Sequence, residues 1–112
     1  MKYNKLVGDR IPGRLRKQGE PFTFHVANDE ELWLKLKEKL LEEAREFLEA
    51  KPEKELEELA DVSEVIDWIM RFGKFSESKL NRAKDKKRQE RGGFRDRIIL
   101  DEAWGTRLKA SF

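Results

Sequence analysis

Two long segments with helical periodicity, residues 28–50 and 52–72, most constrain the fold of this chain. In both, apolar residues recur every three or four positions, as they do on one face of an α-helix. Asn28 followed by Glu31 has the pattern of a capping box that begins the first helix. The helix is broken before Pro52, which suits the first turn of the second helix. The short connection predicts that the two helices are antiparallel neighbours.

Turn and capping residues bound the other predicted elements. They are Asp9, Pro12 and Gly19 for a short first helix, Gly73 for the end of the second long helix, and Ser76 with Gly92 and Gly93 for a third long helix. Residues 22–26 and 94–100 are expected to be short extended segments that pair with each other. The sequence predicts an all-α antiparallel helical bundle, with a single domain over residues 1–100 and a C-terminal tail over 101–112.

The composition limits the chemistry that this chain can support. Its 112 residues suffice for one domain with a modest core. Cysteine is absent and the one histidine, His25, is expected on a strand or the surface, so a metal would be held by oxygen ligands. Such ligands favour Mg²⁺, with Mn²⁺ as a substitute. No apolar run predicts a membrane span or a signal peptide, so we expect a cytoplasmic protein without membrane contacts.

Acidic residues interrupt the apolar faces of both long helices. At about 100° per residue, Glu43 falls inside the apolar arc of the first helix and Glu46 lies at its margin. Glu58 and Asp61 project between apolar directions of the second helix. A buried carboxylate is costly to desolvate, whereas carboxylates that share a cation are compensated. The two pairs therefore predict either a four-carboxylate metal site or acids that reach water or pair with Lys and Arg.

The net charge of +2 conceals a separation of sign along the chain. Residues 29–67 are rich in Asp and Glu, whereas residues 79–97 are rich in Lys and Arg. Opposite charges of this kind would suit a complex of a metal ion with a phosphate compound. The same runs are also typical of solvated helix faces, and the basic run is typical of a nucleic-acid-binding surface.

Three sequence elements carry a resemblance to a known family. The first is EEARE at 42–46 with ELAD at 58–61, the second YNKLVGDRIP at 3–12, and the third KRQERGGF at 87–94. The first resembles the EExxE…ExxD signature of the MazG-like all-α nucleoside triphosphate pyrophosphohydrolases, which include phosphoribosyl-ATP pyrophosphohydrolase and dimeric dUTP pyrophosphatases. The other two are similar to the YNKLVRDKIP and K-x-x-E-R-G-G-F elements of a small single-domain branch.

The resemblance implies an activity and a set of site residues. The activity is Mg²⁺-dependent cleavage between the α and β phosphates of a nucleoside triphosphate, for which house-cleaning of noncanonical nucleotides is the suggested role. The expected assembly is a homodimer or a dimer-based tetramer. The resemblance makes Glu43, Glu46, Glu58 and Asp61 the catalytic, metal-binding acids and leaves Glu42 a supporting role. The residues expected to bind substrate are Lys5, Asp9, Arg10, Lys87, Arg91, Gly92 and Gly93.

One departure from the family pattern keeps other functions open. Gly8 stands where the branch usually has Arg, and Arg10 stands where it has Lys. If the usual Arg contacts phosphate, this change weakens or redirects substrate binding. A noncatalytic helical oligomer is therefore one alternative. A nucleic-acid-binding module built on residues 79–97 is another, although it leaves the acids without a role and is the less favoured partner class.

Overall fold

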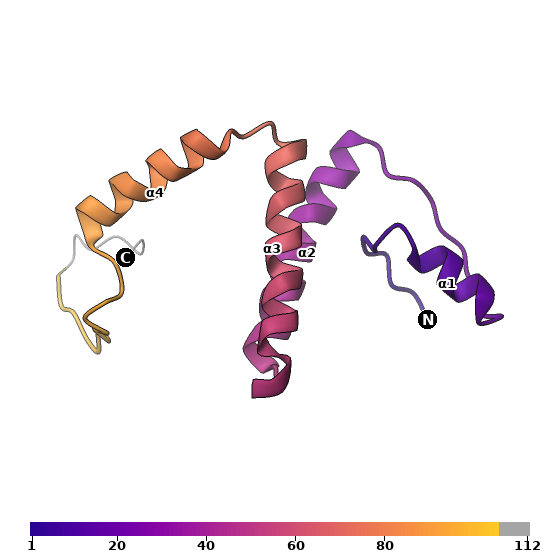
Figure 1. The fold of residues 1–112 in the computed structure, drawn as a ribbon, viewed down its shortest axis with the longest axis horizontal. Coiled ribbons are helices and arrows are strands. Elements are labelled where there is room, and N and C mark those ends of the chain that lie inside the picture. Colours follow the sequence, from indigo (N-terminus) through magenta and orange to yellow (C-terminus); the bar gives the residue numbers. More distant parts are fainter. Residues whose placement is uncertain (106–112) are drawn as a thin grey trace. The chain divides into compact units, whose positions relative to one another are not determined.

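Four α-helices form the regular structure of residues 1–105, the part of the chain that the computed structural model describes (Figure 1). They are α1 (Ile11–Lys17), α2 (Asp29–Glu49), α3 (Glu55–Phe72) and α4 (Glu77–Arg91), and a 3-10 turn, η1 (Pro52–Lys54), connects α2 to α3. The expected all-α class is confirmed. None of these helices is long and apolar enough to cross a membrane. Residues 106–112 of the expected tail lie outside the described part.

The chain divides into two units, which are described separately. The first comprises residues 1–75, in which α2 and α3 are the main packed pair. The second begins at Ser76 and contains α4. The single domain expected over residues 1–100 stays a prediction.

A narrow seam between α2 and α3 holds the core. In the described part of the chain, only Leu36 and Val65 are buried hydrophobic residues, with 3% and 8% of their surface exposed. An aromatic cluster extends the seam, since the Trp33 ring lies 5.9 Å from that of Phe72 and 6.2 Å from that of Phe75. The start of α2 is thereby held against the end of α3 and the residues that follow it.

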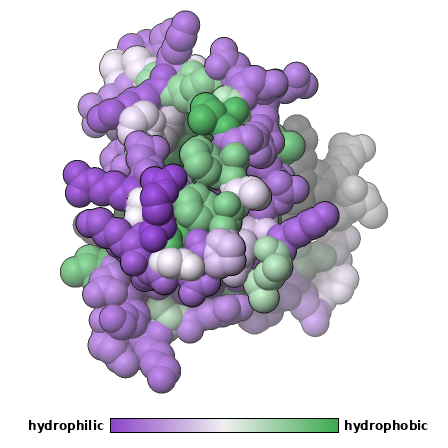
Figure 2. Space-filling view, turned by 90° about the vertical axis from the view of Figure 1, so that its right-hand side faces the viewer, coloured by the Kyte–Doolittle hydropathy of each residue, from purple (hydrophilic) through white to green (hydrophobic). Residues whose placement is uncertain are grey.

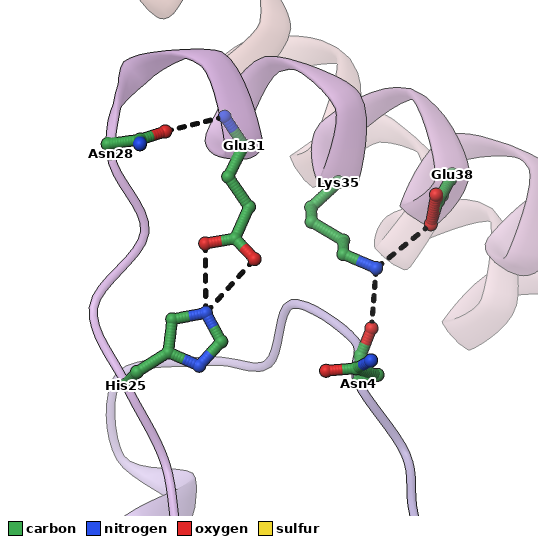
Figure 3. Close-up of polar contacts among 6 residues, drawn as sticks. All are labelled: Asn4, His25, Asn28, Glu31, Lys35 and Glu38. Carbon is green, nitrogen blue, oxygen red and sulfur yellow. Dashed lines mark hydrogen bonds and ion pairs between the residues drawn. The ribbon is translucent and has the colours of Figure 1, made fainter.

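The first turn of α2 is capped by Asn28 as expected, but the Glu31 side chain does not complete the predicted capping box. Asn28 Oδ1 accepts a hydrogen bond from the Glu31 N–H at 2.9 Å. The Glu31 carboxylate, which a complete capping box would return to the Asn28 backbone, instead contacts His25 Nε2 at 2.8 and 3.0 Å (Figure 3). This contact ties the coil before α2 to the helix. Lys35 Nζ adds a second tie by donating to the Asn4 carbonyl at 2.7 Å.

The predicted Asp9 cap of α1 is wrong. Arg10 occupies the N-cap position in a helical conformation, without a side-chain hydrogen bond to the helix start. The Ile11 N–H donates to the Gly8 carbonyl at 3.0 Å, so Asp9 and Arg10 form the middle of a tight turn that leads into the helix. The predicted end holds, because Gly19 follows α1 at φ +70, a conformation that glycine adopts without strain.

The end of α3 is built around Gly73, as predicted, although the left-handed residue is its neighbour. Gly73 is the C-cap, and Lys74 has φ +56. The Phe75 N–H donates to the Met70 carbonyl at 3.0 Å, which closes a Schellman-type turn. A Cβ at position 73 would lie 2.6 Å from the Phe75 ring and 2.9 Å from the Ile69 carbonyl. Glycine therefore lets Phe75 return to the aromatic cluster.

The third long helix also begins as predicted, whereas the expected strands do not form. Ser76 Oγ accepts from the Lys79 N–H at 3.0 Å and caps α4. No strand occurs among residues 1–105, so neither segment 22–26 nor segment 94–100 forms a strand. In the second segment a turn interrupts the extended run, because Arg97 has φ +59 and its N–H donates to the Phe94 carbonyl at 3.2 Å.

The small core leaves many apolar side chains exposed. Figure 2 shows apolar side chains gathered in a band among polar ones on one face of the molecule. The exposed hydrophobic residues of the two packed helices include Leu34, Leu41 and Leu48 on α2 and Leu56, Leu59, Ile66 and Trp68 on α3. Faces of α2 and α3 that do not meet each other therefore carry hydrophobic surface.

We expect Asn28→Ala to lower the free energy of unfolding by about 1 kcal/mol, because the Glu31 N–H loses its acceptor. Asn28→Ser is the matched control, since its hydroxyl retains a capping acceptor. Urea denaturation of the three proteins measures the difference. Equal midpoints for the Ala and Ser variants would show that this cap contributes nothing to stability.

Candidate metal centre

Three carboxylates from two helices meet on the α2–α3 seam. Glu43 of α2 and Glu58 and Asp61 of α3 each offer an oxygen, and these oxygens lie within 4.8 Å of one another. The spacing of three residues places Glu58 and Asp61 on one face of α3, and the packing of the helices brings Glu43 to that face. The side chain of Glu43 is 12% exposed, whereas Asp61 is open to solvent.

The donor set and its spacing fit a hard divalent cation. Mg²⁺ binds oxygen at about 2.0–2.1 Å, so its octahedral ligands are about 3 Å apart when adjacent and about 4.2 Å apart when opposite. The three carboxylate oxygens, within 4.8 Å of one another, are near the upper of these distances. Three protein ligands would leave positions for water or for phosphate oxygens, which Mg²⁺ retains in proteins.

Glu46, the fourth acid of the predicted site, lies outside this group of three. It is an exposed residue of α2. Its negative charge nevertheless contributes to the raised pKa of Glu58, which places Glu46 within electrostatic range. The structure thus brings together three of the four predicted acids and leaves the fourth at their edge.

The acids are electrostatically unbalanced at Glu58. Partial desolvation raises the pKa of Glu58 above its ordinary value, and the negative charges of Glu46, Asp61 and Glu43 raise it further. A raised pKa means that the folded chain holds this proton more tightly than the unfolded chain. The fold therefore loses stability as the pH rises through the folded-state pKa. A bound cation would reverse this effect by stabilising the ionised form.

Two lysines compensate the acids on the α2 side, and sequence reasoning missed one of them. Lys39 Nζ lies 3.2 Å from Glu42 and 3.3 Å from Glu43. Lys5 Nζ donates to Glu42 Oε1 at 2.8 Å and links the N-terminal segment to α2. Lys39 precedes the two glutamates by three and four residues, which is the helical spacing for ion pairs and the signal that could have revealed it.

The ion pair between Lys5 and Glu42 shifts the pKa of both residues. The hydrogen bond with Glu42 raises the pKa of Lys5, and the same bond lowers the pKa of Glu42. The pair contributes stability above the unfolded Glu42 pKa, and this contribution is lost as the pH falls through the lowered folded pKa. Glu42 is therefore engaged in holding the N-terminal segment. This arrangement agrees with the supporting role expected for it.

The remaining predicted substrate residues lie elsewhere in the chain. Asp9 and Arg10 lie in the exposed turn before α1, and Asp9 is not part of the carboxylate group. The others belong to the second unit: Lys87 and Arg91 on α4, Gly92 at its C-cap with φ +80, and Gly93 beyond it. Their role in substrate binding stays a prediction.

Comparison of the chain with protein-family models, curated proteins and solved structures gives no match. The three sequence elements therefore remain a resemblance. The function is inferred from the residues of this chain and from their geometry.

We expect Lys39→Met to strengthen binding of Mn²⁺, used as a probe for Mg²⁺, by about fivefold at neutral pH. The reason is that the Lys39 ammonium competes with the metal for Glu43, in an ion pair worth about 1 kcal/mol. Titration calorimetry measures the affinity. Lys35→Met is the matched control, because Lys35 pairs with Glu38 and the Asn4 carbonyl instead. Weaker or unchanged binding by Lys39→Met would contradict a competing role.

Proposed function

We propose that this protein is a Mg²⁺-dependent nucleoside triphosphate pyrophosphohydrolase that releases a nucleoside monophosphate and pyrophosphate. The observation that carries the proposal is the convergence of Glu43, Glu58 and Asp61 from two helices. The environment of Glu58 supports it, because desolvation and the negative charges of Glu46, Asp61 and Glu43 raise the pKa of this carboxyl, and a cation would stabilise its ionised form. A cation that brings phosphate oxygens with it would satisfy both the acids and its own coordination.

The residues of the site have distinct roles in this proposal. Bound Mg²⁺ supplies charge neutralisation for the phosphate oxygens. Glu43, Glu58 and Asp61 hold the metal, while Glu46, at the edge of the group, orients the attacking water and accepts its proton. Lys5, Asp9 and Arg10 contribute to substrate binding from the N-terminal segment.

Basic and glycine residues of the second unit are proposed to bind the phosphate groups of the substrate. Lys87 and Arg91 lie four residues apart on α4, so they share one helix face and can contact adjacent phosphate groups. Gly92 and Gly93 allow close backbone approach to the substrate. Noncanonical nucleotides are the proposed substrate class, and a homodimer or dimer-based tetramer is the proposed assembly.

The decisive experiment is a pyrophosphate-release assay on canonical, deoxy and oxidised nucleoside triphosphates with Mg²⁺. We expect turnover of at least one of them, and Glu43→Gln or Asp61→Asn to lower kcat by about 100-fold or more, because each removes a charged metal ligand. Glu57→Gln is the matched control on α3, since the Glu57 side chain is 69% exposed and pairs with Lys54. Chelation of the metal should abolish the activity of the parent protein.

The enzyme assignment fails if no triphosphate turns over, or if the Glu43 and Asp61 variants retain the parent rate. Circular dichroism of each variant separates lost chemistry from lost folding. A protein that neither turns over triphosphates nor binds nucleic acid would match the noncatalytic oligomer.

The arrangement of α4 supports a second candidate function, nucleic-acid binding. Lys84, Lys87, Arg88 and Arg91 follow the spacing i, i+3, i+4, i+7 and therefore share one face of this helix. No residue of α4 is buried, so that face is available to phosphate groups. Phe94, which is 95% exposed just beyond the helix, offers a ring on which a base can stack.

If α4 binds nucleic acid, single-stranded oligonucleotides should bind in EDTA, with an affinity that falls as salt concentration rises. Lys87→Glu combined with Arg91→Glu should then weaken binding by 10-fold or more, as expected for the loss of two phosphate contacts. Fluorescence anisotropy measures the affinity, and Glu57→Gln serves as the control. Salt-insensitive binding, or none, would exclude this function.

A further inference from the structure

Three exposed leucines lie in register along α2. Leu34, Leu41 and Leu48 follow one another at intervals of seven residues, and 55%, 62% and 81% of their surfaces are exposed. Seven residues make nearly two helical turns, so the three directions fall within about 40° of one another. Together they form the outer leucine stripe, which extends over about 21 Å of helix.

The outer leucine stripe lies on the side of α2 that α3 does not cover. Leu36, the buried residue of α2, points about 120–160° away from the three leucines at 100° per residue. The packing that buries Leu36 against α3 therefore leaves the stripe without a partner from that helix. A coiled-coil seam repeats apolar residues at two of every seven positions, and the outer leucine stripe supplies one of the two.

We propose that the outer leucine stripe is the contact surface for a second copy of this chain, with the two α2 helices antiparallel and centred on Leu41. In this arrangement Leu41 meets Leu41 of the second copy, and Leu34 meets Leu48 at either end. The seam buries three leucines from each copy. It is compatible with the α2–α3 contact, because the two faces lie on different sides of α2.

The charges beside the stripe favour the antiparallel arrangement. Glu38 and Arg45 lie on the same flank, about 40–60° from the direction of Leu41. Antiparallel helices bring Glu38 of each copy against Arg45 of the other, which gives two ion pairs. In a symmetric parallel pair the matching flanks lie on opposite sides of the seam, so Glu38 of each copy would lie against Lys37 of the other. The two Glu38–Arg45 pairs therefore form only in the antiparallel register.

The surface beside Leu41 has room for a side chain of the second copy. A shallow depression of about 270 Å³ is lined by Leu41 and by five charged residues, Glu38, Glu42, Arg45, Glu46 and Glu49. A side chain entering from a facing helix would meet Leu41 and a predominantly acidic rim. A competing surface on α3 exposes Leu59 and Ile66.

This inference rests on the proposed self-association and is independent of the proposed pyrophosphohydrolase chemistry. The parent sequence has no cysteine, so a single introduced thiol reports only its own position. All measurements are made without nucleotide or metal. A failure of this contact surface is therefore separate from a failure of the enzyme assignment.

The test is disulfide formation between single-cysteine variants under mild oxidation. We expect Leu41→Cys to form a crosslinked dimer with itself, and Leu34→Cys to crosslink when mixed with Leu48→Cys. Leu34→Cys alone should remain uncrosslinked, because its two copies would be about 21 Å apart, beyond the reach of a disulfide. Ile66→Cys is the control for the exposed face of α3 and should also remain uncrosslinked.

A charge exchange tests the flanks of the same surface. Glu38→Arg and Arg45→Glu should each weaken the dimer by about 10-fold in analytical ultracentrifugation, because each change turns two attractions into repulsions. The double variant should restore the parent affinity. A double variant no better than the single ones would overturn the proposed register.

Other outcomes overturn the proposal in distinguishable ways. Self-crosslinking of Leu34→Cys would show a parallel contact, and crosslinking of Ile66→Cys in place of Leu41→Cys would show a contact through α3. Either result would refute this contact surface but not the proposed oligomer. A monomeric mass at assay concentration would refute both the surface and the proposed oligomer, whatever the pyrophosphate assay shows.

Discussion

The packing of α2 against α3 is the contact on which the rest of the first unit depends. It buries Leu36 and Val65, and it also brings Glu43 to Glu58 and Asp61. These two consequences oppose each other, because every acid in the seam takes the place of an apolar side chain that would enlarge a very small core. The rings of Trp33, Phe72 and Phe75 offset part of this loss at one end of the seam.

Charge balance around the acids is local and incomplete. Lys39 bridges Glu42 and Glu43, and Lys5 adds a cation to Glu42, so the α2 side of the cluster is largely neutralised. On the α3 side, desolvation and the negative charges of Glu46, Asp61 and Glu43 raise the pKa of Glu58. A divalent cation at the three carboxylates would supply the missing charge where the two helices meet. One of these ion pairs also holds the N-terminal segment, because Lys5 binds Glu42 of α2.

Helix boundaries could be read from the sequence because they depend on neighbouring residues. Asn28 and Ser76 cap as expected, since each side chain needs only the backbone N–H three residues ahead. The prediction for Asp9 failed because the Gly8–Ile11 turn, which precedes the helix, fixes the chain there without the carboxylate. The prediction of a complete capping box failed because the Glu31 carboxylate binds His25 of the preceding coil. Where a side chain has several possible partners, the tertiary structure determines which one it contacts.

The candidate site shows the same limit at longer range. Helical periodicity predicted inward directions for Glu43, Glu58 and Asp61, which come together although Asp61 stays exposed. It could not say that Glu46 lies outside their group, because that depends on how α3 is placed. The assumption of a single apolar face on α2 also does not predict the outer leucine stripe. The inner face of α2 meets α3, and one edge carries Lys35, Lys39 and Glu42, which anchor the N-terminal segment or balance the acids. The outer face carries the leucines. A helix that makes contacts on several sides departs from the simple amphipathic pattern. Acids on its apolar face and leucines on its exposed face therefore indicate binding sites.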